Sequence, residues 1–179
     1  FLALDLISQA EHSSDTFCYL ITNSQKIAKL VNKIILKLLP TIQRKELVKS
    51  SLFKNGFIAV CKNNSDMIKL VNSLAPEHLQ IMTKNPKLIS SKITTAGLVL
   101  LGNYSPSSAS DYILGSNHIL PTNGFGKTRG SLSVMDFIKI NTEVTASKSS
   151  LTKISKHLDV LTQSEGLPNH YEAVRGRLE

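Results

Sequence analysis

Short apolar runs with the composition of β-strands alternate with amphipathic helical stretches between residues 17 and 101. The predicted strands are residues 17–21, 57–61, 79–82 and 97–101. From Ile27 to Leu39, apolar residues recur at steps of three and four, which predicts one stripe along a helix that Pro40 ends. Strands that alternate with helices favour parallel pairing, because parallel strands need crossover connections. We therefore expect an α/β fold with an open, mostly parallel, incomplete Rossmann-like sheet and flanking helices.

Polar residues ahead of the apolar patterns predict where the helices begin. Thr22, with Gln25 three residues later, offers a capping box for the first of these helices. Asn64 and Ser65 can cap another, which Pro76 interrupts. Weaker helical patterns cover residues 1–7, 42–52 and 86–89.

Between residues 102 and 130 the composition shifts to Gly, Ser, Asn and Pro. Long polar segments of this kind are uncommon in compact domains and are often functional. Beyond it, apolar residues from Leu151 to Leu161 predict an amphipathic helix, and Pro168 can start a last one that runs toward Arg177. We therefore divide the chain into an α/β part, 1–135, and a helical C-terminal tail, 136–179.

The chain carries a formal net charge of +8, which would suit an anionic partner. Only four of its 21 basic residues are Arg, however, and the lysines are scattered along helix-like faces without interleaved aromatic residues. This pattern favours solvated helix faces over a nucleic-acid interface.

Composition also bears on the compartment and on the class of protein. With 41% hydrophobic and 19% charged residues among 179, the chain is typical of a globular protein. Lysines between Lys26 and Lys37 interrupt its most apolar window, so no membrane-spanning helix is predicted. Cys18 and Cys61 are isolated, which argues against a disulfide framework or a cysteine zinc site and favours the reducing cytoplasm. Because Phe1 opens directly into a helix-compatible run, without an initiator Met or a secretion signal, we expect the later part of a longer protein.

Two segments supply candidate metal ligands. Gln9 and His12 lie three residues apart, so on a helix their side chains would emerge from one face. A surface histidine near a helix end is the alternative. Asp111 and His118 lie in the polar segment, where the Asp111 carboxylate could complete a metal site with the His12 imidazole and the Gln9 amide oxygen.

Two further segments pair a carboxylate with an imidazole. Glu77 and His78 follow Pro76, and such a pair suits proton transfer, since His can accept a proton near neutral pH while Glu separately activates water. An exposed pair at a helix boundary is the alternative. Glu165 and His170 lie across a Gly and a Pro near the C-terminus, where a solvated turn is the alternative.

Two motifs typical of nucleotide-binding loops are rejected. Residues 126–128 resemble the end of a P-loop, but Pro121 stands where the motif requires Gly. Gly124, Gly126 and Gly130 miss the dinucleotide spacing by one residue.

Five ordered segments are more specific together than any one of them is alone. They are Gln9-Ala-Glu-His12, Ala-Pro-Glu77-His78-Leu, Asp111-Tyr-x-x-Gly-x-Asn-His118-x-Leu-Pro-Thr122, Leu132-Ser-Val-x-Asp136-Phe and Glu165-Gly-Leu-x-x-His170. This set resembles histidinol dehydrogenase, from about Asp5 to the C-terminus. The chain departs from the family pattern at Ser13 and Ser14 and at residues 126–129.

The resemblance implies an NAD-dependent, zinc-containing enzyme that oxidises L-histidinol to L-histidine through an aldehyde, in the two hydride transfers that end histidine biosynthesis. It implies that Glu77 and His78 are the acid–base pair and that His118 and Glu165 contact the substrate. The implied zinc ligands, which with His78 also border the substrate, are Gln9, His12, Asp111 and His170. His157 matches no family position and is expected on a helix surface.

The family's subunits form homodimers, in which the tail histidine reaches into the partner's site. Residues 136–179 are therefore expected to serve dimerisation, and residues 1–135 to be the later part of a catalytic domain. The family's NAD-binding residues lie in the earlier half of longer chains, so we expect no cofactor-binding residue here, and a piece that is inactive and poorly stable alone. The alternatives are a related zinc- and NAD-dependent polyol dehydrogenase, an inactive binding module and a basic nucleic-acid binder.

Overall fold

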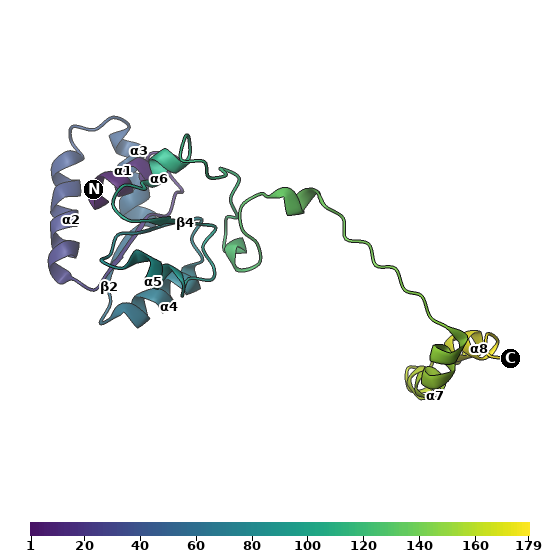
Figure 1. Cartoon of the computed structure of the whole chain (residues 1–179). Coiled ribbons are helices and arrows are strands. Elements are labelled where there is room, and N and C mark those ends of the chain that lie inside the picture. The colour runs from purple at the N-terminus through teal and green to yellow at the C-terminus, as the bar shows by residue number, and fades with distance from the viewer. The chain divides into compact units, whose positions relative to one another are not determined.

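The computed structural model describes all 179 residues and divides into two compact units, Phe1–Phe137 and Ile138–Glu179 (Figure 1). The first unit holds, in chain order, α1 (Leu2–Ala10), β1 (Tyr19–Thr22), α2 (Gln25–Leu38), α3 (Lys45–Ser50), the π-helical turn η1 (Ser51–Asn55), β2 (Phe57–Val60), α4 (Asn64–Leu74), β3 (His78–Ile81), α5 (Pro86–Ser90), β4 (Leu98–Leu101), α6 (Ser107–Ser110) and the 3-10 turns η2 (Phe125–Lys127) and η3 (Val134–Phe137). The second unit holds α7 (Lys148–Ser164) and α8 (Pro168–Arg175). Each predicted helix and strand is present close to its expected position.

The strands pair in parallel, as their alternation with helices predicts. Tyr19 of β1 lies opposite Phe57 of β2, and His78 of β3 lies opposite Leu98 of β4. The α/β class with parallel strands and a helical tail is thus confirmed. The structure divides the expected open sheet in two, because β1 pairs only with β2 and β3 only with β4. Helices α2 and α3 make the crossover of the first sheet and α5 that of the second, so each parallel pair has the connection that it needs.

Two helices are capped one or two residues away from the predicted residue. The Ser24 hydroxyl, not Thr22, caps α2 by accepting a hydrogen bond from the backbone N–H of Ile27 at 3.3 Å. The Thr22 hydroxyl instead accepts from the backbone N–H of Ser24, which forms the turn between β1 and α2. Asn63 caps α4 in place of Asn64 and Ser65, and it accepts from the backbone N–H of Asp66 at 3.0 Å. In both cases the extended backbone of the capping residue aims its side chain at the free amides of the first turn.

The core of the first unit lies between α1, β1, α2 and α3. Val31 and Ile35 of α2 pack with Ala3 and Leu20, and a second cluster joins Ala10, Cys18 and Val48. The two small alanines allow α1 to lie close to its neighbours. The predicted stripe on α2 is only partly buried, because one layer of packing covers a narrow face of a helix. Its exposed members include Ile27, Leu30 and Ile34.

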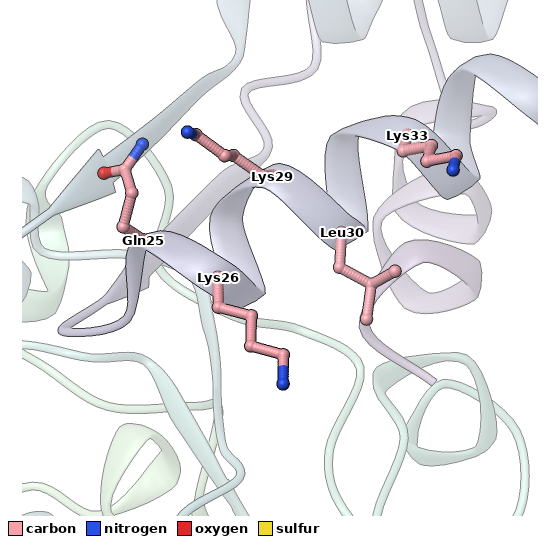
Figure 2. Close-up of a pocket in the computed structure, with 5 residues that line it drawn as sticks. All are labelled: Gln25, Lys26, Lys29, Leu30 and Lys33. Carbon is pink, nitrogen blue, oxygen red and sulfur yellow. The ribbon is translucent and has the colours of Figure 1, made fainter.

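A shallow hollow lies on the exposed side of α2. Its lining residues are Gln25, Lys26, Lys29, Leu30 and Lys33 (Figure 2). None of the predicted site residues lines this hollow. Its three lysines, Lys26, Lys29 and Lys33, are all exposed, as expected for a solvated helix face.

Two glycines let the polar segment after β4 pack back against the strands. A Cβ at Gly97 would lie 2.9 Å from both the Glu77 carbonyl oxygen and the Pro121 ring. A Cβ at Gly126 would overlap the Thr95 carbonyl oxygen. Residues 121–126 are therefore held against residues 95–97.

The second unit is a helical hairpin. Helix α7 ends at Ser164 with Glu165 as its C-cap, Gly166 takes a left-handed backbone conformation with φ 70°, and Pro168 starts α8 as predicted. No residue of α7 or α8 is buried. Across both units, no helix is long and apolar enough to cross a membrane.

Candidate functional site

The centre of the site is an imidazole and a carboxylate from distant segments. His78 is the first residue of β3, and Asp111 ends α6. His78 Nε2 lies 3.2 Å from Asp111 Oδ1, and the two side chains are 16% and 6% exposed. A hydrogen bond between such shielded groups is stronger than one in water, because the local dielectric constant is lower.

Two more predicted residues flank this pair. His118 Nδ1 lies 3.4 Å from the same Asp111 Oδ1, and its imidazole is 66% exposed. Glu77 Oε1 lies 3.9 Å from His78 Nδ1, with a side chain that is 40% exposed. Two imidazoles therefore face one carboxylate oxygen, and a second carboxylate lies nearby in contact with water.

Helix α1 supplies the next two predicted residues. Gln9 lies in its last turn, and the exposed His12 follows the helix, with its backbone N–H donating to the Gln9 carbonyl oxygen. Helix α1 packs against α6, the helix that Asp111 ends. The fold thus places Gln9 and Asp111 on neighbouring elements.

The last two predicted residues belong to the second unit. Glu165 is the C-cap of α7, and His170 lies in the first turn of α8, so the two flank the turn at Gly166. Both are exposed.

Of the four implied zinc ligands, Gln9, His12 and Asp111 belong to the first unit and His170 to the second. No three His, Cys, Asp or Glu side chains are grouped so that they could hold a metal ion. The residues themselves nevertheless fit zinc, because Gln9, His12 and Asp111 offer an amide oxygen, an imidazole nitrogen and a carboxylate oxygen, donors that zinc accepts. The Gln9 Nε2 atom is also buried without a hydrogen-bond partner, so its amide is not committed to another contact.

Sequence reasoning assigned no role to Asp5 and Gln80, two polar residues close to this region. Asp5 Oδ2 and Gln80 Nε2 are buried and have no hydrogen-bond partner. Burial raises the pKa of the Asp5 carboxyl, while the N-terminal ammonium group and, less strongly, the neighbouring Gln80 amide act to lower it. Their spacing in the sequence places each on the same face as a predicted site residue. Asp5 lies one helical turn before Gln9, and Gln80 lies two residues after His78 in a strand.

Comparison with known proteins matches nearly the entire chain to one family. The family model described as histidinol dehydrogenase matches residues 1–178. The histidinol dehydrogenase of Oceanobacillus iheyensis is 39% identical over 179 residues, which are 100% of this chain and 42% of that protein. That of Campylobacter jejuni strain RM1221 is 41% identical, with the same shares of the two chains covered.

A solved structure agrees with this result. The crystal structure of histidinol dehydrogenase from Elizabethkingia anophelis superposes with a TM-score of 0.84 at 35% sequence identity, and the match covers 99% of this chain and 41% of that one. The chain therefore spans about two fifths of the length of the proteins that it matches. With its motifs, its fold and these matches in agreement, the chain belongs to the histidinol dehydrogenase family.

Proposed function

We propose that this chain is part of an NAD-dependent, zinc-containing histidinol dehydrogenase, an oxidoreductase of histidine biosynthesis. The observation that carries the proposal is the shielded Asp111 carboxylate, with the His78 and His118 imidazoles on one oxygen and Glu77 beside them. Asp111 is 33 residues from His78 in sequence, so a local turn does not account for their pairing. All four lie in the family motifs.

When bound, zinc supplies a Lewis acid that orients the amino alcohol, and NAD supplies the acceptor for hydride. We infer that the zinc ligands are Gln9, His12, Asp111 and His170 of the partner subunit. The more exposed His118 imidazole and the Glu165 carboxylate are proposed to contact the substrate. The two unpaired cysteines, Cys18 and Cys61, favour a reducing cytoplasm as the place of action.

His78 is the proposed acceptor of the alcohol proton. When Nε2–H donates to Asp111 Oδ1 at 3.2 Å, the lone pair of the neutral imidazole lies on Nδ1. Nδ1 would then take the hydroxyl proton of L-histidinol, while NAD would supply the acceptor for the hydride of the carbon that bears this hydroxyl. Asp111 stabilises the imidazolium that forms. The product of this step is the aldehyde.

Glu77 is suited to the second oxidation because its carboxylate is more exposed to water than the His78 imidazole. It can take a proton from a water molecule while the oxygen of that water bonds to the aldehyde carbon. A second NAD would supply the acceptor for the hydride of this hydrate, and loss of its hydroxyl protons to solvent would leave the carboxylate of L-histidine. The two neighbouring side chains thereby act on different atoms.

The second unit suits a role in dimerisation. It has no buried residue, and Ile154, Val160 and Leu161 are exposed on α7. Two helices without a core are marginally stable in water, so contact with a second copy of the chain would stabilise them. We propose that this contact brings His170 and Glu165 to the partner's site.

The test uses the protein expressed from the complete reading frame that contains this chain. NADH formation is followed with L-histidinol and with its aldehyde, for the wild type, His78→Asn and Glu77→Gln. His157→Asn and Glu46→Gln are matched controls, since both residues are exposed on helices. His78→Asn is expected to lower kcat for L-histidinol by about 10²–10⁴-fold, the usual contribution of a general base. Glu77→Gln is expected to lose aldehyde oxidation and to retain alcohol oxidation.

Several results would contradict the proposal. Turnover of another polyol in place of L-histidinol would favour a related polyol dehydrogenase. A folded protein without turnover would favour a binding module, and salt-sensitive retention of RNA or DNA would favour a nucleic-acid binder. Equal loss of both steps in Glu77→Gln would refute the separate role of Glu77. The 179-residue chain alone is expected to lack turnover, because the family's NAD-binding residues lie outside it.

A further inference from the structure

Four buried polar atoms of the first unit have no hydrogen-bond partner. They are Asp5 Oδ2, Gln9 Nε2, Gln80 Nε2 and Ser107 Oγ. Buried polar groups in folded proteins are nearly always paired, and each exception calls for an explanation. Three of these atoms match as hydrogen-bond partners, because the Asp5 oxygen accepts while the two amide nitrogens donate.

The backbone places these three side chains near one another. Asp5 and Gln9 are four residues apart on α1, so they lie on one face with about 5–6 Å between their Cβ atoms. Gln80, on β3, lies near enough to the Asp5 carboxyl to affect its pKa. Asp5 therefore offers an unused acceptor close to two amide groups whose donors are also unused.

An amide that binds a metal ion must do so through its oxygen, because its nitrogen has no free lone pair. The NH₂ group of such a ligand has to be turned away from the ion and needs an acceptor of its own. Side chains that orient metal ligands in this way are a regular part of metal sites. Asp5, one helical turn before Gln9 on the same face of α1, has a free acceptor atom.

We propose that Asp5 is a positioning residue that accepts a hydrogen bond from Gln9 Nε2 and so turns the Gln9 oxygen toward the metal ion. This inference rests on the zinc site of the proposed function. Gln80 lies beside the same carboxylate, on the strand that begins with His78. Asp5 itself does not touch the substrate or the metal ion.

The test compares Asp5→Leu with Asp5→Asn in the protein from the complete reading frame. Leu has nearly the shape of Asp and removes both acceptor oxygens, whereas Asn keeps one. Zinc affinity is measured by competition with a chromophoric chelator, and the melting temperature is measured on the metal-free protein. Asp15→Asn, an exposed carboxylate of the same unit, is the control.

Asp5→Leu is expected to bind zinc about 10–100-fold more weakly, the usual effect of losing such a partner. Asp5→Asn is expected to lose less, since its remaining oxygen still accepts from Gln9. The metal-free melting temperature of Asp5→Leu is expected to match or exceed that of the wild type, because an apolar group replaces an unpaired buried oxygen. Zinc loss with an unchanged melting temperature separates positioning from a general structural role.

Three outcomes would overturn the inference. Unchanged zinc affinity in Asp5→Leu, with a wild type that binds zinc, would refute it and leave the proposed function intact. A parallel fall in affinity and metal-free melting temperature would assign Asp5 a structural role only. A wild type that binds no zinc would refute the proposed function, and this inference with it.

Discussion

Gly126→Ala tests whether the polar segment that follows β4 is held in place by close backbone packing. The added Cβ would overlap the Thr95 carbonyl oxygen and lie 3.1 Å from the Thr95 carbonyl carbon. Both are backbone atoms, so the clash is relieved only if one segment moves away from the other. Overpacking of this kind costs about 1–3 kcal/mol. With a urea m value of about 2 kcal/mol/M, the unfolding midpoint should fall by about 0.5–1.5 M.

Gly130→Ala is the matched control, four residues along the same segment. A Cβ at Gly130 meets nothing within 4 Å, and its φ is not in the left-handed region. That substitution should be neutral or raise stability by about 0.4–1 kcal/mol, because Ala restricts the unfolded chain more than Gly does. Urea unfolding of the two variants, followed by circular dichroism, gives the comparison. If Gly126→Ala unfolds at the same urea concentration as Gly130→Ala, the proposed packing contact does not exist.

Three further predictions concern local structure in the first unit. Ser24→Ala should lower the free energy of unfolding by about 1 kcal/mol, because α2 loses its capping oxygen. A melting temperature equal to that of the wild type would contradict the assignment of Ser24 as the cap. Burial raises the pKa of the Cys18 thiol to about 11, so iodoacetamide should label the partly exposed Cys61 first in mass spectra, and equal labelling rates would refute the burial of Cys18. The backbone N–H of Ser133 and, less strongly, Arg129 hold the pKa of the Asp136 carboxyl below its ordinary 3.8. The ionised carboxylate therefore stabilises the folded state above pH 3.8, and this stabilisation is lost as the pH falls through the lowered pKa. Asp136→Asn should therefore melt below the wild type at neutral pH and approach it in acid, whereas a constant difference across pH would exclude the ionisation as its cause.

The sequence predicts the helix caps only to within one or two residues. The Ser24 and Asn63 caps lie within two residues of those predicted, because Thr22, Ser24, Asn63 and Asn64 all offer suitable oxygens. Backbone conformation chooses between them, and each choice depends on how the preceding strand enters the helix. Residue type therefore locates a cap only approximately.

In the candidate site, the sequence predicted the residues and the structure gave their arrangement. Glu77, His78, Asp111 and His118 were all predicted from their chemistry and motif spacing. That both imidazoles face one oxygen of Asp111 became visible only with the folded chain. Asp5 and Gln80 were passed over because an unpaired buried atom is a property of packing, which no short motif records.

The helices, the strands, their parallel pairing and the family motifs were all predictable from the sequence alone. These features depend on periodicity, capping and spacing within a few turns of chain, where the interacting groups are close in sequence. The division of the strands into two sheets and the packing of Gly126 against Thr95 depended on the tertiary structure. Such contacts join distant segments and are decided by which surfaces fit together across the whole fold, so their free energies are not encoded in any one stretch of residues.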